Sequence, residues 1–272
     1  MADTPAVPLT LEGSSVLHQI LRVRWSVWRA LSASHREHVI AQAAEALGDM
    51  EQGGRSGSAL YSVLGHKGDL MLVHFRPSFE QLEAVQRQVR KLQLFEYLEQ
   101  ITSYLSVVEL GLYESTQKTY NSLSEQGIEP HSPDWNAAIE ETLKRQREAM
   151  APRLIPEIPA ARYICFYPMD RKRGESKNWY QEPMADRIRM MHEHGMIGRR
   201  YAGEVRQIIS GSIGFDDWEW GVDLFAEDPL VFKKLIYEMR FDEVSAVYAL
   251  FGTFVIGLRL PSSGLGGYLA LE

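Results

Sequence analysis

The 272-residue sequence predicts an α+β fold made of two similar halves, because one strand-and-helix pattern occurs twice. Residues 69–75 (DLMLVHF) and 218–225 (WEWGVDLF) are short apolar runs typical of strands, and an amphipathic helical pattern follows each. Residues 104–110 and 254–260 form a second pair of strand-like runs at the same offset. Each copy of the repeat therefore contains a strand, a helix and a strand.

The two repeated helices have matching start signals. Ser78 is the predicted N-cap residue of the first helix, since a serine side chain can accept a hydrogen bond from a first-turn N–H. Asp228 is the predicted N-cap residue of the second, with Pro229 in the first helical position. Both helices are therefore expected to begin at the same place in their half.

Two further strands and a further helix are predicted in each half. The strands are expected at residues 16–25 and 59–64 in the first half, and at residues 162–169 and 203–210 in the second. Residues 59–64 would form a hairpin with residues 69–75, and residues 203–210 with residues 218–225.

The remaining helices complete the predicted order. Ser34 is the expected cap of the helix after residues 16–25, because Glu37 stands three residues later. The corresponding helix of the second half is expected to begin near Pro183, with Gly195 as the residue after its C-terminus. Strand, helix, strand, strand, helix, strand then occurs twice, which is a duplicated ferredoxin-like fold of the dimeric α+β-barrel type. Two unrelated α+β domains are the alternative.

The repeat also predicts the domain boundaries. They give an N-terminal half, a linker or insertion, and a C-terminal half: residues 1–115, 116–156 and 157–272. The segment from Glu114 to Pro156 is polar and contains one helical run, from Asp134 to Met150. We expect its degree of order to vary.

Composition excludes several classes of protein. Lys and Arg total 29 against 36 Asp and Glu, and the resulting net charge of −7 argues against a nucleic-acid partner. Cys165 is the only cysteine, so the chain cannot form an internal disulfide, which favours a reducing compartment. The N-terminal sequence lacks a signal peptide pattern, and no apolar run is long enough for a membrane span. We therefore expect a cytoplasmic protein.

A basic segment and a strand face mark the candidate site. Residues 171–200 hold eight basic side chains against four acidic ones, which favours a small anionic ligand, although a solvated charged surface is the alternative. Tyr163, Cys165 and Tyr167 should share one face of their strand, because alternate residues do so. Arg171 is expected to return to the side of Tyr167.

Gln207 and two histidines are further candidates. Gln207 falls between aliphatic residues on its strand face, as either a hydrogen-bonded core residue or the polar group of an apolar pocket. His192 and His194 are two positions apart on a predicted helix, so they point about 200° apart and cannot share one metal ion. Motifs of metalloproteases, nucleotide-binding proteins and serine hydrolases are absent from the sequence.

Three runs resemble a known family. They are residues 167–180 (YPMDRKRGESKNWY), residues 194–246 (beginning HGMIGRRYAGEVRQ) and residues 251–259 (FGTFVIGLR). They are similar to the chlorite dismutase-like family, and in particular to its coproheme decarboxylases of the Gram-positive type. The similarity is dense from about residue 153 to 260 and absent from 117 to 149. It implies a duplicated ferredoxin-like fold, haem in the C-terminal half, and a homopentamer.

The resemblance assigns roles at the iron. It makes His194 the proximal iron ligand and leaves His192 as a flanking residue. Gln207 takes the distal position, where chlorite dismutases have an arginine; Arg206 should point to the opposite face. Because glutamine can donate a hydrogen bond but is a poor proton shuttle, this residue favours a decarboxylase over a chlorite dismutase or a peroxidase.

Tyr167 resembles the redox tyrosine of the family. A phenoxyl radical can remove a hydrogen atom from an unactivated propionate carbon, which an ordinary base cannot do. Arg171 stands where many relatives have a lysine, and arginine does not give up its proton, so only an electrostatic role is expected. The residues expected on the propionate side are Arg153, Trp179, Arg240 and Ser245, with Met169 beside the reacting group and Tyr113 as a weaker candidate.

The implied reaction converts Fe-coproporphyrin III (coproheme) into haem b. Hydrogen peroxide would be consumed, and two propionates would leave as CO2 to give vinyl groups through a three-propionate intermediate. The ferrochelatase that supplies coproheme would be a transient partner. The alternatives are a haem-binding carrier or sensor, and a chlorite dismutase-like haem oxidoreductase.

Overall fold

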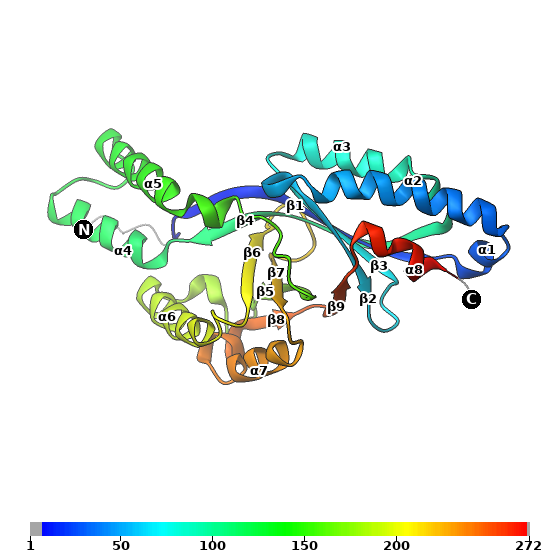
Figure 1. Cartoon of the computed structure of the whole chain (residues 1–272). Coiled ribbons are helices and arrows are strands. Elements are labelled where there is room, and N and C mark those ends of the chain that lie inside the picture. The colour runs from blue at the N-terminus through cyan, green and yellow to red at the C-terminus, as the bar shows by residue number, and fades with distance from the viewer. Residues whose placement is uncertain (1–6, 271–272) are drawn as a thin grey trace.

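The computed structural model describes residues 7–270, and the outermost ends of the two predicted halves lie outside it. One antiparallel sheet contains nine strands (Figure 1). They are β1 (Thr10–Val23), β2 (Ser58–Val63), β3 (Leu70–Arg76), β4 (Leu98–Gly111), β5 (Tyr163–Arg171), β6 (Arg206–Gly211), β7 (Trp220–Ala226), β8 (Ala249–Phe251) and β9 (Val255–Arg259). The helices are α1 (Trp25–Arg29), α2 (Ala33–Glu51), α3 (Phe79–Arg90), α4 (Tyr113–Glu125), α5 (Pro133–Leu154), α6 (Met184–Arg200), α7 (Leu230–Met239) and α8 (Leu265–Leu269).

The sheet closes into a barrel. Its strand order is β7-β6-β4-β1-β3-β2-β9-β5-β8, and β5 also pairs with β7, so eight strands form a continuous ring. The predicted hairpins are confirmed, since β2 pairs with β3 and β6 pairs with β7 in antiparallel register. Strands of the two halves join at β4–β6 and β2–β9.

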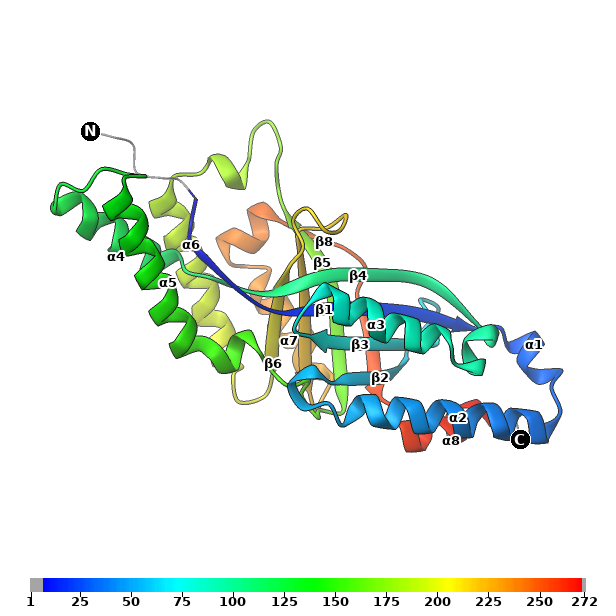
Figure 2. The same ribbon diagram turned by 90° about the horizontal axis from the view of Figure 1, so that it is seen from above.

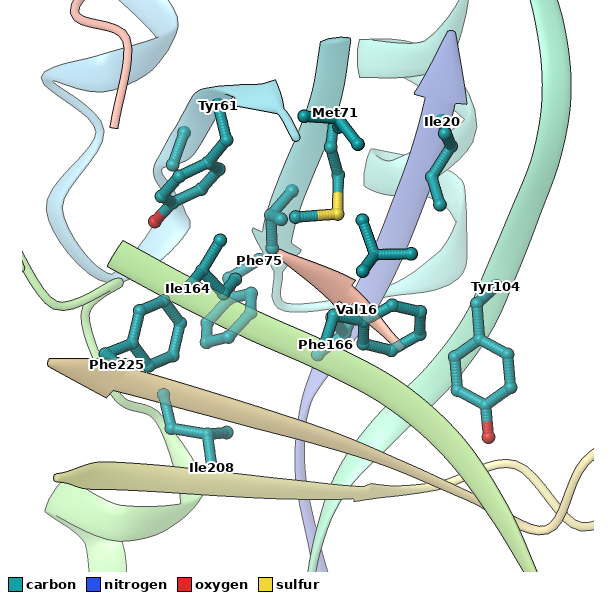
Figure 3. Packing of buried hydrophobic residues seen from close by; sticks show 14 of the residues in the cluster. Val16, Ile20, Tyr61, Met71, Phe75, Tyr104, Ile164, Phe166, Ile208 and Phe225 are labelled. Carbon is teal, nitrogen blue, oxygen red and sulfur yellow. The ribbon is translucent and has the colours of Figure 1, made fainter. Parts of the chain in front are cut away.

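Apolar side chains from all eight ring strands fill the barrel. Figure 3 shows this interior, in which Phe75, Phe166 and Phe225 are among the buried aromatic residues. Helices cover the outer surface: α2 packs over the N-terminal half, and α6 and α7 over the C-terminal half (Figure 2). Residues that alternate along one strand therefore face either the barrel interior or a helical layer.

Several predicted element ends are wrong. Ser32, not Ser34, caps α2, because the Ser32 hydroxyl accepts the His35 N–H at 3.3 Å while Ser34 already lies in the first turn. Asp228 does accept the N–H of Leu230 at 2.9 Å, but α7 begins at Leu230, so the proline precedes the helix. The first strand also ends at Val23 rather than reaching residue 25.

Gly195 does not end its helix. Helix α6 continues to Arg200, and its last turns place Ile197 and Tyr201 against the apolar layer over β5 and β7. A glycine inside a helix costs only about 1 kcal/mol, which this packing outweighs.

The segment between the halves contains two helices rather than one. Helix α5 includes the predicted run and begins after Ser132, whose hydroxyl accepts the Trp135 N–H at 3.2 Å. The prediction missed α4, whose polar sequence conceals a buried stripe that includes Tyr120 and Leu123, packed against Trp135. Figure 1 shows both helices beyond one end of the barrel.

His74 on β3 gives the fold a pH dependence. The Ser58 hydroxyl lies 2.7 Å from its Nδ1 and the Gln19 carbonyl oxygen 3.2 Å from its Nε2, an arrangement that suits a neutral ring. Complete burial, followed by the charges of Arg76 and His18, lowers the His74 pKa to about 3. The unfolded chain therefore binds this proton at a higher pH than the folded chain does.

We expect the free energy of unfolding to fall as the pH drops from about 6.5 toward 3, because His74 takes up a proton only on unfolding in that range. Its share of the slope is about 1.4 kcal/mol per pH unit. Urea unfolding at several pH values should give a shallower slope for His74→Gln than for the parent. The exposed-site variant His35→Gln should keep the parent slope; equal slopes for both variants would contradict the assignment.

Candidate functional site

The candidate site lies on the outer face of β5, β7 and β6. Cys165 and Tyr167 pack in the layer under α6 and α7, whereas Ile164 and Phe166 point into the barrel. This confirms the predicted shared face of Tyr163, Cys165 and Tyr167. The strand register places Tyr167 opposite Val222 of β7, and Val222 opposite Ile209 of β6.

Gln207 belongs to the same face. It lies opposite Leu224, which in turn lies opposite Cys165. Val205 is buried, but the side chains of Gln207 and Ile209 are exposed on the folded chain. Gln207 is therefore not a buried core residue, and its role as the polar group of a pocket stays a prediction.

His194 on α6 is held by a carboxylate. Its Nδ1 lies 2.8 Å from Oδ2 of Asp242 and 3.4 Å from the Ser245 hydroxyl. Burial acts to raise the Asp242 pKa, but hydrogen bonds from His194 and from the Ser245 N–H outweigh it, and the pKa is lowered. In the tautomer whose Nδ1–H donates to an ionised Asp242, Nε2 is the ring nitrogen with a free lone pair, which can bind a metal.

His192 has a different partner. Its Nδ1 lies 2.9 Å from Oε1 of Glu114 on α4, and both side chains are exposed. The two histidines therefore serve separate contacts, as their spacing predicts. Within residues 7–270, no three His, Cys, Asp or Glu side chains form a group that could hold a metal ion.

Arg171 is a buried cation at the end of β5. It is 9% exposed, its guanidinium lies 5.1 Å from the ring centre of Trp179, and its Nη1 has no hydrogen-bond partner. Burial lowers the Arg171 pKa, but a guanidinium remains charged at neutral pH. A buried cation with an unused donor fits an anionic ligand.

Tyr113 and Trp179 lie beside this cation. Their ring centres are 6.5 Å apart, and the ring of Tyr248 lies 5.4 Å from Trp179 on another side. Burial raises the Tyr113 pKa, while the charges of Arg171 and Arg187 act to lower it. Arg171 and Trp179 of the basic segment thus belong to an aromatic and cationic cluster with Tyr113 and Tyr248, in addition to the charged surface of that segment.

Tyr167 is enclosed by aromatic rings. It is 4% exposed, stacks on Phe254 with ring centres 4.4 Å apart, and lies 5.7 Å from Phe251. The Arg240 guanidinium covers the Phe251 ring at 3.7 Å. Burial raises the Tyr167 pKa, although Arg240 and Arg171 act to lower it. The phenol therefore keeps its proton at neutral pH, in the field of two cations.

Three further predicted residues have these positions, and Asp242 was missed. Arg153 is exposed near the end of α5, and Ser245 contacts His194 and Asp242 rather than Arg171. Met169 is half-buried and packs against the apolar cluster that contains Tyr167. Asp242 was not predicted; it lies within a run that resembles the family, but no spacing rule in the sequence connects it to His194.

Known proteins identify the family. A sequence model described as chlorite dismutase matches residues 36–260. The chain belongs to the chlorite dismutase family. A heme-binding protein from Thermus thermophilus is 38% identical, with 98% of this chain and 99% of that chain covered and a TM-score of 0.83. A mutant chlorite dismutase from Candidatus Nitrospira defluvii shares the fold, with 16% identity, 95% and 96% coverage and a TM-score of 0.70.

The family fold matches what the chain shows, a mixed α+β structure with a large antiparallel sheet and helices on its outer side. Across residues 7–270, every helix is too short or too polar to cross a bilayer.

Proposed function

We propose that this member of the chlorite dismutase family is a hydrogen peroxide-dependent coproheme decarboxylase that makes haem b. One observation supports the proposal most strongly. The buried phenol of Tyr167 lies in the electric field of Arg171 and Arg240, and its side of the sheet also carries Gln207 of β6. A heme-binding protein among the similar structures supports an iron porphyrin as the ligand. The proposal includes two ferredoxin-like halves, a homopentamer, a cytoplasmic location and delivery of coproheme by ferrochelatase.

The described residues fit an iron porphyrin. His194 would bind the iron through Nε2, because Asp242 contacts its other ring nitrogen and would accept the proton there. Arg171 offers a buried donor for a propionate, and Trp179 and Tyr113 line the same place. Arg240 supplies a second cation near Tyr167. Arg153, Ser245 and Met169 are proposed to assist on the propionate side.

Each of these residues then has a separate role in the proposed reaction. When bound, the iron porphyrin supplies the redox chemistry with hydrogen peroxide. For each propionate the overall change is R–CH2–CH2–COO⁻ + H2O2 + H⁺ → R–CH=CH2 + CO2 + 2 H2O. Tyr167, as a phenoxyl radical, removes the hydrogen atom from the propionate chain, and Arg171 and Arg240 hold carboxylates in position. Gln207 donates a hydrogen bond on the distal side but does not move protons.

The proposed reaction is tested by mass spectrometry. Purified protein with ferric coproporphyrin III is titrated with hydrogen peroxide, and the porphyrin mass is followed. Two successive losses are expected, each equal to CO2 plus two hydrogens. A porphyrin that binds tightly and keeps its mass would instead support a haem carrier or sensor.

Activity toward chlorite distinguishes a coproheme decarboxylase from a chlorite dismutase. Because Gln207 replaces the distal arginine expected of a chlorite dismutase, the haem-loaded protein should release little oxygen from chlorite. An oxygen electrode gives the result directly. Rapid O2 release over many turnovers would favour a chlorite dismutase-like oxidoreductase.

Asp242→Asn tests how His194 is held. The neutral amide is a weaker acceptor, so we expect about a 10- to 100-fold loss of iron porphyrin affinity. The iron–histidine stretching frequency in resonance Raman spectra should also fall. Glu114→Gln, which alters the pair with His192, is the matched control and should leave both quantities unchanged. Equal effects of the two variants would argue against the assignment.

A further inference from the structure

The partly buried carboxyl group of Glu109 has no role in the proposed function so far. Glu109 on β4 covers Gly211 of β6 so closely that a Cβ atom at residue 211 would collide with the carboxyl oxygen. The indole Nε1 of Trp220 on β7 donates to Glu109 Oε1 at 3.3 Å. The side chain of Glu109 therefore lies on the outer, site-bearing face of the barrel.

The strand register connects Glu109 to the reacting side. Gly211 lies opposite Trp220, and Trp220 lies opposite Met169. Val107 is the β4 residue paired with Gly211, and the Glu109 carboxyl reaches over Gly211 to Trp220, so it lies beside the row that ends at Met169. Gly111 is two residues further along β4, on the same strand face as Glu109, and a Cβ atom at residue 111 would meet Cε2 of the Tyr113 ring at 3.3 Å. The face of β4 that carries Glu109 is thus the one against which Tyr113 packs, and the Tyr113 ring lies 6.5 Å from the ring of Trp179.

The surroundings of Glu109 favour the protonated acid. Burial raises the Glu109 pKa most, the Trp220 hydrogen bond acts to lower it, and the charge of Glu12 raises it further. Glu12 on β1 lies directly opposite Glu109 in the sheet, and it is bound on its exposed side by Arg147 of α5. The charges of Arg171 and Arg187 act on Tyr113 and oppose the rise of its pKa.

The proposed reaction requires a proton donor, since each decarboxylation consumes one proton. Arg171 does not release its proton, and Gln207 does not titrate. Burial raises the pKa values of Tyr113 and Tyr167, so both phenols hold their protons tightly. A carboxyl group of raised pKa keeps its proton to a higher pH than an ordinary glutamate does, so it is available as a donor there.

We propose that Glu109 supplies this proton. This inference rests on the proposed function. The Glu109 O–H bond breaks, its proton joins the hydroxide left when hydrogen peroxide is reduced, and water forms. The electron pair of the O–H bond stays on Glu109, whose carboxylate then takes up a proton from solvent before the second propionate reacts.

The porphyrin-free protein provides the first test. Infrared spectra at increasing pH should show a carboxylic acid C=O stretch that disappears at a pH above the ordinary range for glutamate, and Glu109→Gln should lack this band. Glu12→Gln removes the negative charge opposite Glu109, so the carboxylic acid band should disappear at a lower pH than in the parent. A parent spectrum without such a band would overturn the proposal.

Single-turnover kinetics provide the second test. With coproheme bound and peroxide added, Glu109→Gln should slow CO2 release about a hundredfold while coproheme affinity changes less than about threefold. Small carboxylic acids in the buffer should restore part of the rate, which a merely structural role would not allow. Glu109→Asp should keep most of the rate, and Glu12→Gln should shift the alkaline limb of the pH profile to lower pH.

Two outcomes distinguish a failure of the role of Glu109 from a failure of the proposed function. A parent protein that releases CO2 together with a Glu109→Gln variant of normal rate and pH profile overturns the role of Glu109 alone. A parent protein that binds coproheme and never releases CO2 overturns the proposed function, and the role of Glu109 falls with it. Glu99→Gln, an exposed change at the other end of β4, should match the parent in every measurement.

Discussion

Replacing Tyr167 with phenylalanine should abolish CO2 release from coproheme while coproheme affinity stays within a few-fold of the parent. The hydroxyl is the only group that the change removes, and the stacking on Phe254 is retained. A phenylalanine ring cannot form the phenoxyl radical that the proposed hydrogen-atom transfer requires. Product analysis after addition of peroxide, with coproheme binding measured by absorbance titration, gives both quantities.

Tyr163→Phe is the matched control for this experiment. Tyr163 is on the same strand and face, four residues earlier, and belongs to the same apolar layer. We expect it to convert coproheme at the parent rate. If Tyr167→Phe also makes haem b at the normal rate, the radical role of Tyr167 is wrong, whatever the protein binds.

The repeat carried much of the fold prediction. The pattern that recurs 150 residues apart predicts β3 and β7 with the helices that follow them, and a strand-like run before each predicts the hairpins β2–β3 and β6–β7, which both form. Closure of the sheet through β5–β7, β4–β6 and β2–β9 could not be predicted, because pairing between distant strands depends on the global register rather than on local pattern. Helix ends such as Ser34 and Gly195 failed because tertiary packing overrode a local signal.

The candidate site, like the fold, could be predicted from the sequence only in part. Alternation along β5 correctly places Tyr167 and Cys165 on one face, because the period of a strand is a local property. The partners Asp242 and Glu109 come from other elements, 48 residues from His194 and 111 residues from Trp220, and only the folded chain brings them together. Residue types in sequence thus indicate which groups can carry the chemistry, and the structure shows which group holds or polarises another.

Replacing His194 with alanine should remove the iron ligand and give the second large effect. We expect ferric coproporphyrin III and haem b to be retained at least about tenfold more weakly, with a shifted Soret band, because no other ligand replaces the imidazole. His192→Ala should change both properties little, since its ring faces Glu114 on the exposed side of α6. Absorbance titrations of the two variants measure the difference.

Iron-free coproporphyrin III distinguishes loss of the ligand from loss of the site. Its propionates would contact Arg171 and its neighbours, none of which depends on a metal bond, so His194→Ala should bind it as tightly as the parent does. A variant that loses iron-free and ferric porphyrin alike has a damaged pocket and says nothing for His194 as the ligand. Equal losses of ferric porphyrin in His192→Ala and His194→Ala would place the iron away from α6 and remove the basis for Asp242 as its supporting residue.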